Sequence, residues 1–326
     1  MEYPKFKVCC RCFTFNHSKY ITDTMNGFTM QQTSFPFVCC IVDDASTDGE
    51  QEVIRKYVEE NFDFSEGSVA YHKETDYAHI TYAQHKTNKN CYFAVLYLKE
   101  NHYSQRKPKM QYLEEWRGMC EYEALCEGDD YWIVPDKLEK QVIYLDNNPD
   151  CSLCFTNAYV NFDMKGHEDV FKDLYNHLEE KDYEGTEILE RWSIPTASVV
   201  YKNGIITPKD KRFLYGDIVL FLTAFTYGRL HCINERMVCY RRNVNGASVK
   251  KQNYKKMVEH YTAIEEHFGK EYEIIVKKHK AKCLIMWFLS GHLKKESWTA
   301  LHDTYKEGLV LLFIILFFPV LYKVIK

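Results

Sequence analysis

The chain has 326 residues with 46 acidic and 42 basic side chains, which give a formal charge of −4 at pH 7. A chain of this length can bury one large core, alone or with an appended segment. A general nucleic-acid-binding protein usually carries a basic excess, so we expect no nucleic-acid partner for this chain.

The 13 cysteines invite a disulfide or zinc interpretation, but their number is odd and no secretory signal precedes them. Cys151 and Cys154 form a single CxxC pair, and no second pair stands at the spacing of a zinc ribbon. Five of the others lie in strand-like runs, where cysteine behaves as a small buried hydrophobe; they are Cys9, Cys10, Cys12, Cys39 and Cys40. We therefore predict reduced, buried thiols and a reducing, cytoplasmic compartment.

Two apolar runs open the chain, and a helical pattern follows each of them. Thr47 and Glu50 stand at the spacing of a capping box, which favours a helix that starts beside them. Two strand–helix units in succession predict a parallel sheet. The expected elements are a strand over residues 6–13, a helix over Tyr20–Gln32, a strand over Val38–Val42 and a helix over about Glu50–Asn61.

Paired acids, Asp43 and Asp44, end the second predicted strand. The segment that starts at Asp44 resembles a calcium loop, but Arg55 stands at the twelfth position, where such a loop needs a glutamate. Calcium binding is therefore not expected. Carboxylates at a strand end can instead accept hydrogen bonds from a nucleobase or from ribose hydroxyls. Thr47 and Asp48 are explained as well by helix capping.

The acidic turn, Glu127-Gly-Asp-Asp130, gathers three carboxylates just before Tyr131 and Trp132. It is predicted to lie between a strand over residues 121–126 and a helix over residues 137–147. In open α/β sheets, ligands bind in such turns. Because like charges repel and are costly to desolvate, a cation such as Mg²⁺ or Mn²⁺ is a natural reason to gather them. A solvated acidic turn remains the alternative.

The pattern is weakest over residues 63–118, where strands are expected at Val69–Tyr71 and Tyr92–Leu98 with a loop between them. Later elements are clearer. They are a strand over Cys151–Phe162, weak helix over residues 163–185, a turn at Ile188–Trp192, a strand over Pro195–Tyr201, a helix over Ile218–Tyr227 and two short strands within Arg229–Cys239.

Asp217 and two arginines mark the end of this part of the chain. Asp217 stands at a predicted helix start, where capping explains an acid as well as a functional role does. Arg241 and Arg242 follow a predicted strand, and two guanidinium groups can clamp an anion such as a diphosphate.

The C-terminal part changes in character. Residues 250–295 carry eleven lysines against five glutamates and show long helical runs, and Leu309–Ile325 is the most hydrophobic segment. As a helix that segment would span about 25 Å, against about 30 Å for a bilayer core. Its flanking lysines favour an anionic membrane surface. We expect a membrane anchor, with a buried core helix as the alternative.

Four motifs, in this order, resemble the family 2 glycosyltransferases, which have the GT-A fold. They are Phe13-Thr-Phe-Asn16, Val42-Asp-Asp-Ala-Ser-Thr-Asp-Gly49, Glu127-Gly-Asp-Asp-Tyr-Trp132 with Asp136-Lys-Leu-Glu-Lys-Gln141, and Tyr215-Gly-Asp217. The third motif is similar to that of a subgroup common in bacteria that build surface polysaccharides. The resemblance covers roughly residues 5–248, and only loosely residues 63–118.

The resemblance implies an α/β fold with a Rossmann-like, mostly parallel central sheet flanked by helices. The hydrophobic segment described above adds a helical, membrane-associating tail to this fold. The expected parts are a GT-A domain over residues 1–248, a basic helical extension over residues 249–307 and a hydrophobic membrane-anchoring tail over residues 308–326.

The resemblance also implies roles on the donor side. Asp44 would contact the base of a nucleotide, with uracil expected, and Phe15 would line that pocket. Asp129 would contact the ribose, and Asp130 would bind the Mg²⁺ or Mn²⁺ that bridges the diphosphate. Arg241 would help to bind the diphosphate.

On the acceptor side, the resemblance makes Asp217 the general base and places Trp132 against a sugar face, although core packing explains Trp132 equally well. Arg242 is an alternative to its neighbour for the diphosphate, and Asn243 stands where relatives often carry histidine. The Gln-x-x-Arg-Trp motif of processive synthases is absent from the sequence, which favours transfer of a single sugar.

The implied function is metal-dependent, inverting transfer of a hexosyl or N-acetylhexosaminyl group from a UDP-sugar. The acceptor would be a hydroxyl of a glycan or lipid-linked molecule in surface polysaccharide synthesis, at the cytoplasmic face of the inner membrane. A catalytically inactive nucleotide-sugar-binding membrane protein of the same fold is the alternative. A dinucleotide oxidoreductase is disfavoured because no Gly-rich fingerprint follows the first strand. A metal phosphohydrolase would keep the acids but has no need of a nucleotide pocket.

Overall fold

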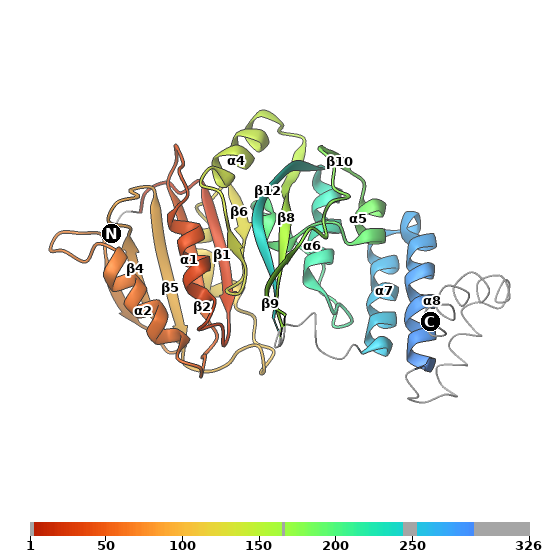
Figure 1. The fold of residues 1–326 in the computed structure, drawn as a ribbon, viewed down its shortest axis with the longest axis horizontal. Helices are drawn as coiled ribbons and strands as arrows, with labels where there is room; N and C mark the ends of the chain where they lie inside the picture. Colours follow the sequence, from red (N-terminus) through yellow and green to blue (C-terminus); the bar gives the residue numbers. More distant parts are fainter. Residues whose placement is uncertain (1–2, 165–166, 244–252, 290–326) are drawn as a thin grey trace. The chain divides into compact units, whose positions relative to one another are not determined.

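The computed structural model describes residues 3–164, 167–243 and 253–289 (Figure 1). The chain divides into two compact units. The first combines Met1–Ile205 with Ala224–Val249, and the second combines Ile206–Thr223 with Lys250–Lys326. The boundaries expected from the sequence, after residues 248 and 307, stay a prediction.

A mixed sheet, twelve-stranded within the described residues, is the framework of the first unit (Figure 1). Its strands are β1 (Val8–Thr14), β2 (Phe37–Asp43), β3 (Tyr71–Glu74), β4 (Ala78–Gln84), β5 (Cys91–Leu98), β6 (Tyr122–Leu125), β7 (Tyr131–Trp132), β8 (Cys151–Met164), β9 (His167–Lys172), β10 (Lys181–Tyr183), β11 (Val200–Lys202) and β12 (Arg229–Asn243).

The centre of the sheet is parallel. β1 pairs with β2 and β6, and β2 pairs with β5, all in parallel. β8 and β12 form a further parallel pair. Antiparallel strands extend this centre: β4 and β3 lie beyond β5, and β11 joins β6 to β8. The parallel sheet predicted from the two opening strand–helix units is therefore confirmed at the centre of the fold.

The helices that contain Phe28, Ile54 and Leu138 pack on one face of this sheet, and the short helix that contains Trp116 packs on the other. Side chains of β1 alternate between the faces, as the pleat requires, so that Cys10 packs with the helix residues Phe28 and Ile54, whereas Cys9 packs with Trp116 on the other face. All thirteen cysteines are free and buried, as predicted. The helices are α1 (Ile21–Thr29), α2 (Glu50–Asn61), α3 (Glu114–Arg117), α4 (Lys137–Asn147) and α5 (Gly185–Arg191), with 3-10 turns at Met110–Leu113 and Thr196–Ser198.

Three segments differ from the sequence-based expectation. The loop expected before Tyr92 contains β4, the weak helix expected over residues 163–185 is replaced by β9 and β10, and Ile188–Trp192 lies largely in α5 rather than in a turn. Polar side chains in these strands have partners distant in sequence. Asp182 of β10 contacts His231 of β12, with 2.8 Å between Oδ1 and Nδ1. These polar residues give no alternating apolar pattern, and their partners cannot be identified from the local sequence, so the sequence did not indicate strands here.

The predicted capping box at the start of α2 does not form. Gly49 is the N-cap residue, with φ of 89°, and no side chain caps the helix at that position. The carboxylate of Asp48 accepts hydrogen bonds from the backbone N–H groups of Ser18 (3.0 Å) and Glu50 (3.1 Å). The Glu50 side chain is buried and points toward the loop after β1, where it accepts the backbone N–H of His17.

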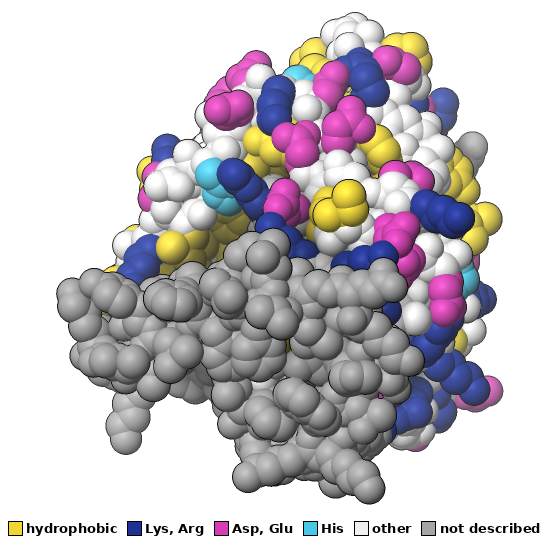
Figure 2. Space-filling view, turned by 90° about the vertical axis from the view of Figure 1, so that its right-hand side faces the viewer, with side chains coloured by type: hydrophobic (Ala, Val, Ile, Leu, Met, Phe, Trp, Pro, Cys, Tyr) yellow, Lys and Arg dark blue, Asp and Glu magenta, His cyan; other side chains and the backbone are white. Residues whose placement is uncertain are grey.

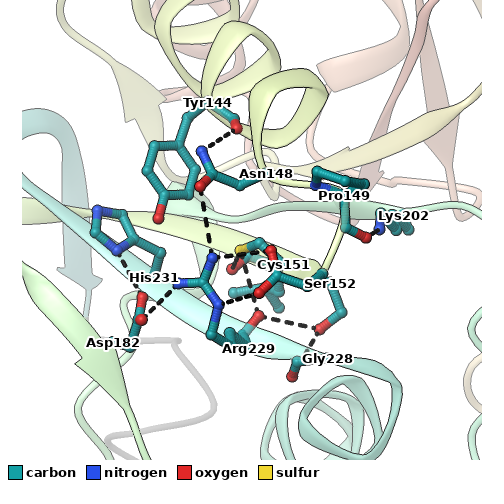
Figure 3. A network of polar contacts seen from close by, with 12 residues as sticks. Tyr144, Asn148, Pro149, Cys151, Ser152, Asp182, Lys202, Gly228, Arg229 and His231 are labelled. Carbon is teal, nitrogen blue, oxygen red and sulfur yellow. Dashed lines mark hydrogen bonds and ion pairs between the residues drawn. The ribbon is translucent and has the colours of Figure 1, made fainter.

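A polar network joins the starts of β8 and β12 to β10 (Figure 3). Arg229 forms ion pairs with Asp150 and Asp182, and Asp182 also contacts His231. The Tyr144 ring stacks on His231 with 4.0 Å between the ring centroids. Because the ion pairs of Arg229 are partly exposed, solvent screens them and each contributes little to stability. The network lies at the opposite end of β12 from Arg241.

The second unit contains the start of α6 (Gly216–Tyr227) and the helices α7 (Tyr254–Phe268) and α8 (Glu273–Leu289), with a 3-10 turn at Lys270–Tyr272. α7 and α8 lie side by side, and Tyr261 stacks on His279 with 4.9 Å between the ring centroids (Figure 1). On the face seen in Figure 2, basic and acidic side chains are interspersed.

No helix within residues 3–164, 167–243 and 253–289 is both long enough and apolar enough to cross a membrane. The predicted membrane-anchoring tail, residues 308–326, lies outside these described residues.

Candidate functional site

The loops that follow β1, β2 and β6 meet at one edge of the sheet, because these three strands run parallel. The backbone N–H of Asp44 donates to the Thr14 carbonyl (3.0 Å), and that of Gly128 donates to the Phe13 carbonyl (3.2 Å). Asn16 has a φ of 57°, a conformation that non-glycine residues rarely adopt and that is often found at functional sites. Open α/β sheets bind ligands at this edge.

Glu50 joins two of these loops. Its carboxylate accepts hydrogen bonds from the Thr14 hydroxyl, the backbone N–H of His17 (2.9 Å) and the Ser46 hydroxyl (2.8 Å). Burial raises the pKa of Glu50, and these hydrogen bonds oppose that change. The loops after β1 and β2 are thus fixed relative to each other by one buried carboxyl group.

The acidic turn lies between β6 and β7 and is held at both ends of its backbone. The Thr24 hydroxyl of α1 donates to the carbonyls of Gly128 (3.1 Å) and Asp130 (2.7 Å). A Cβ atom on Gly128 would lie 2.0 Å from the hydroxyl oxygen of Thr14, so only glycine allows this approach to β1.

The two neighbouring carboxylates of the turn differ in exposure. Asp130 is 4% exposed, and its Oδ1 accepts the backbone N–H of Arg241 (2.7 Å). The Asp129 side chain is 17% exposed, and its Oδ2 accepts the side-chain amide of Asn243 (2.8 Å). The Nε2 atom of His17 lies 3.8 Å from the same oxygen. The more exposed carboxylate therefore remains open to a ligand.

These carboxylates fit a divalent cation. Within the described residues, the second oxygen of Asp129 and that of Asp130 have no hydrogen-bond partner. Burial and the charge of Asp129 raise the pKa of Asp130, so ionisation there is unfavourable unless a positive charge is added. No group of three or more His, Cys, Asp and Glu side chains in the described chain is placed to hold a metal. Mg²⁺ and Mn²⁺ complete their coordination with substrate phosphates and water.

Arg241 supports the turn from β12. Its guanidinium donates to the Asp129 carbonyl (2.8 Å) and to the carboxylate of Asp23 (2.8 Å). The same group lies over the rings of Tyr20 (4.6 Å) and Tyr131 (4.8 Å). The side chain is 5% exposed. Arg241, which was predicted to bind the diphosphate, therefore holds the acidic turn in this structure.

Asp44 is also engaged within the protein. Its carboxylate is buried and accepts the backbone N–H groups of His102 (2.8 Å) and Tyr103 (3.0 Å) and the ammonium of Lys109 (2.8 Å). These contacts fix the loop after β5 against the end of β2. A nucleobase would have to replace one of these donors to contact Asp44. Phe15, predicted to line the same pocket, is 41% exposed.

Trp132 lies in the core, which is one of the two positions that the sequence left open for it. The side chain is 1% exposed, and its Nε1–H donates to the carbonyl of Ala197 (2.9 Å). It packs edge-on against Phe28, with 4.9 Å between the ring centroids. The indole N–H has a hydrogen-bond partner, and the ring is enclosed because the Trp132 side chain on β7 points toward α1.

Asp217 belongs to the second unit. It lies in the first turn of α6, where its Oδ1 accepts the backbone N–H of Ile218 (2.9 Å). The helix start predicted from the sequence at this position is confirmed.

The structure thus brings Asp129, Asp130 and Arg241 together. It adds two polar residues that the sequence did not single out as ligands, Thr24 and His17. The contact from Asn243 to Asp129 could have been predicted from the sequence. Residues two apart on a strand point to the same side, so Asn243 was expected to lie beside Arg241. No sequence pattern predicts the contacts of Thr24, which lies in α1, or of His17, which lies in the loop after β1.

No model of a known protein family matches the chain. Curated relatives include an uncharacterized protein of Mycobacterium bovis and one of Mycobacterium tuberculosis, each 29% identical over 242 residues. The match covers 72% of this chain and 58% of each relative, so the chain spans less than two thirds of their length.

Among solved structures, residues 1–349 of S. aureus TarS in complex with UDP-GlcNAc align with a TM-score of 0.54 and 15% identity, over 92% of this chain and 79% of that chain. The UDP complex of the same protein aligns with a TM-score of 0.53 and 16% identity, over 87% and 72%. The mannosyltransferase PcManGT from Pyrobaculum calidifontis, in complex with GDP-Man and Mn²⁺, aligns at 0.48 and 14%, over 92% and 79%.

The similarity to TarS shows the fold. The chain has a GT-A fold, an α/β architecture with a central multi-stranded sheet flanked by helices.

Proposed function

We propose that the chain is a metal-dependent, inverting glycosyltransferase of the family 2 type that transfers one sugar from a UDP-sugar to a hydroxyl group. One observation carries this proposal. The carboxylates of Asp129 and Asp130 lie at the ligand-binding edge of a GT-A fold, and each keeps an oxygen for a further partner. The similar structures of TarS contain UDP and UDP-GlcNAc, which supports a uridine nucleotide and a hexosyl or N-acetylhexosaminyl group.

On the donor side, Asp129 binds the ribose, Asp130 is the metal ligand, and the exposed ring of Phe15 forms a wall for the base. Arg241 keeps the turn in place through the Asp129 carbonyl. Mg²⁺ or Mn²⁺ bound beside the diphosphate supplies Lewis-acid stabilisation of its developing negative charge.

On the acceptor side, Asp217 is the general base. Its carboxylate takes the proton of the acceptor hydroxyl while that oxygen forms a bond to the anomeric carbon. The bond from the anomeric carbon to the diphosphate breaks, and the nucleoside diphosphate leaves with its electron pair. Attack from the side opposite the leaving group inverts the configuration.

Activity measurements with UDP-glucose and UDP-N-acetylglucosamine in the presence of Mn²⁺ test these roles. Loss of the metal ligand or of the general base should lower donor hydrolysis about 100-fold or more, so Asp130→Asn and Asp217→Asn should both be nearly inactive. The control Asp173→Asn changes a carboxylate that is 39% exposed and should act as the wild type. Full activity in both site variants would overturn the mechanism.

The hydrophobic tail and the lysine-rich region before it support a membrane location, at the cytoplasmic face of the inner membrane. A glycan or lipid-linked acceptor of surface polysaccharide synthesis fits that location. Flotation with anionic phospholipid vesicles tests this part. The variant with Phe313→Arg and Phe317→Arg should no longer float, since each arginine opposes insertion by about 3 kcal/mol. Equal flotation of both proteins would contradict the anchor.

A catalytically inactive nucleotide-sugar-binding protein of the same fold is the second candidate. The carboxylate of Asp44 and the guanidinium of Arg241 are both occupied by intramolecular contacts, which favours a site with fewer groups free for a substrate. Calorimetry separates the two functions. Binding of a UDP-sugar with no hydrolysis or transfer by the wild-type protein would establish the inactive one.

A further inference from the structure

A cavity of about 480 Å³ opens within the second unit. Pro208, Phe213 and Val219 give it an apolar surface. Gly216, the first residue of α6, also lines it and directly precedes Asp217. The cavity therefore lies beside the residue proposed as the general base.

The loop that forms this cavity is firmly anchored to α7. Arg212 forms an ion pair with Asp210 and reaches Glu266 of α7, with N–O distances of 2.6 Å in both cases. The backbone N–H of Leu214 donates to Nδ1 of the buried His260 (3.2 Å). These contacts hold residues on both sides of Phe213, so the cavity is a fixed part of this unit.

The cavity has a positive rim. Lys209 and Lys211 line it, and neither has an ion-pair or hydrogen-bond partner within the described part of the chain. Asp210 between them is already paired, and the Arg212 guanidinium holds the pKa of that carboxyl below its usual range. His267 lies 3.2 Å from the same carboxylate. The acidic side chain in the lining thus leaves both lysines available to an anion.

We propose that this cavity binds the acceptor and that the acceptor carries a phosphate group beside its saccharide. The proposal rests on the proposed glycosyltransferase function and names the substrate class of its acceptor site. The apolar face of a sugar ring can pack on Pro208 and Phe213, while Lys209 and Lys211 bind the phosphate as compact cations. Such a ligand would hold a hydroxyl near Asp217.

Saturation-transfer NMR tests the proposal by measuring how tightly the full chain binds glucose 6-phosphate and glucose. The wild type should bind glucose 6-phosphate more tightly than glucose. The double variant Lys209→Gln, Lys211→Gln should bind glucose 6-phosphate about fivefold more weakly, as expected for the loss of two partly exposed ion pairs.

The matched control is Lys5→Gln, Lys56→Gln, which removes the same charge from side chains that are 85% and 77% exposed. It should bind glucose 6-phosphate as the wild type does, and thermal melting should show that both double variants are folded. Equal binding of the two sugars by the wild type, no binding at all, or unchanged binding by the Lys209 and Lys211 variant would overturn the proposal.

A competition arm identifies the source of the phosphate. Phosphatidylcholine vesicles that contain a polyprenyl-phosphate sugar should displace glucose 6-phosphate if the acceptor is lipid-linked, whereas vesicles without it should not. No displacement by either vesicle indicates a soluble phosphate-bearing glycan.

Donor hydrolysis by the wild type with Mn²⁺ is measured in parallel. Absence of hydrolysis would reject the transferase function, whereas lysine-independent binding would reject the acceptor cavity alone.

Discussion

Lys137 is a buried, charged residue that packs against Trp132, close to the acidic turn. It is the first residue of α4, it is fully buried, and its ammonium has no hydrogen-bond partner within the described residues. The nitrogen lies 4.2 Å from the centroid of the Trp132 ring. Burial lowers the pKa of Lys137 from 10.5 to about 8. The lysine therefore reduces stability at neutral pH, although it packs against the residue that follows the acidic turn.

Replacement of this lysine should stabilise the protein. At pH 7 the folded state must hold a proton that burial disfavours, so Lys137→Met should raise the free energy of unfolding by about 3 kcal/mol. Between pH 8 and 10.5 the unfolded chain binds more protons than the folded one, so wild-type stability should rise with pH. The variant should lack that rise.

Chemical denaturation at several pH values measures this difference. Lys140→Met, one turn along α4, is the control, because its side chain is 38% exposed and its ion pairs should contribute little. A variant at position 137 that is less stable than the wild type at pH 7 would show that the contact with Trp132 outweighs the desolvation of the ammonium.

At the scale of elements, the acidic turn depends on its close approach to β1. Gly128→Ala would place a Cβ atom 2.0 Å from the Thr14 hydroxyl and force the turn away from the strand. Overpacking of this kind usually lowers stability by about 1–3 kcal/mol. The turn also carries the proposed metal ligand, so affinity for UDP with Mn²⁺ should fall as well.

Thermal denaturation of Gly128→Ala and of the control Gly216→Ala checks this prediction. Apart from its chain neighbours and the backbone of its own helix, no atom of the described residues lies within 4 Å of a Cβ built on Gly216, so the control should melt close to the wild type. Equal melting temperatures for all three proteins would mean that the turn can move away from β1 without loss.

In the second unit, His260 connects the cavity loop to α7. It is fully buried, burial lowers its pKa to about 4, and its Nδ1 accepts the backbone N–H of Leu214. Below pH 6.5 the unfolded chain takes up a proton that the folded chain does not, so stability should fall as the pH drops toward 4. This one group accounts for about 3 kcal/mol over that range.

The variant His260→Asn should remove this part of the pH dependence, because an amide oxygen can accept the same N–H without titrating. The measurement is the difference in free energy of unfolding between variant and wild type from pH 7 to pH 4. His79→Asn, whose side chain is 40% exposed, is the control. A wild-type curve parallel to that of His260→Asn would contradict the assignment.

At the scale of the whole molecule, the sequence predicted the parts that rest on local patterns. The helices Glu50–Asn61 and Lys137–Asn147 match their predicted ranges, because apolar spacing and flanking turn residues are local signals. The strands β1 and β2 were equally clear as short apolar runs. The order of the motifs also led to the GT-A fold.

Features that depend on contacts between distant residues could not be predicted. Asp44 is bound by a loop almost sixty positions later in the chain, and Arg241 of β12 contacts Asp23 of α1, which is 218 positions earlier. Trp132 could face a ligand or the core, and only the packing of α1 against β7 decides between them. β4 was missed because its polar residues, such as Thr81, find partners across the sheet.

In the proposed function, the acidic turn binds the diphosphate of a nucleotide together with a divalent cation. Isothermal titration of UDP into the wild-type protein and into Asp130→Asn, each with and without Mn²⁺, tests this binding. We predict binding to the wild type that strengthens at least about tenfold with Mn²⁺, and no such gain in the variant. UDP affinity that is independent of Mn²⁺, or an equal gain in Asp130→Asn, would contradict the account.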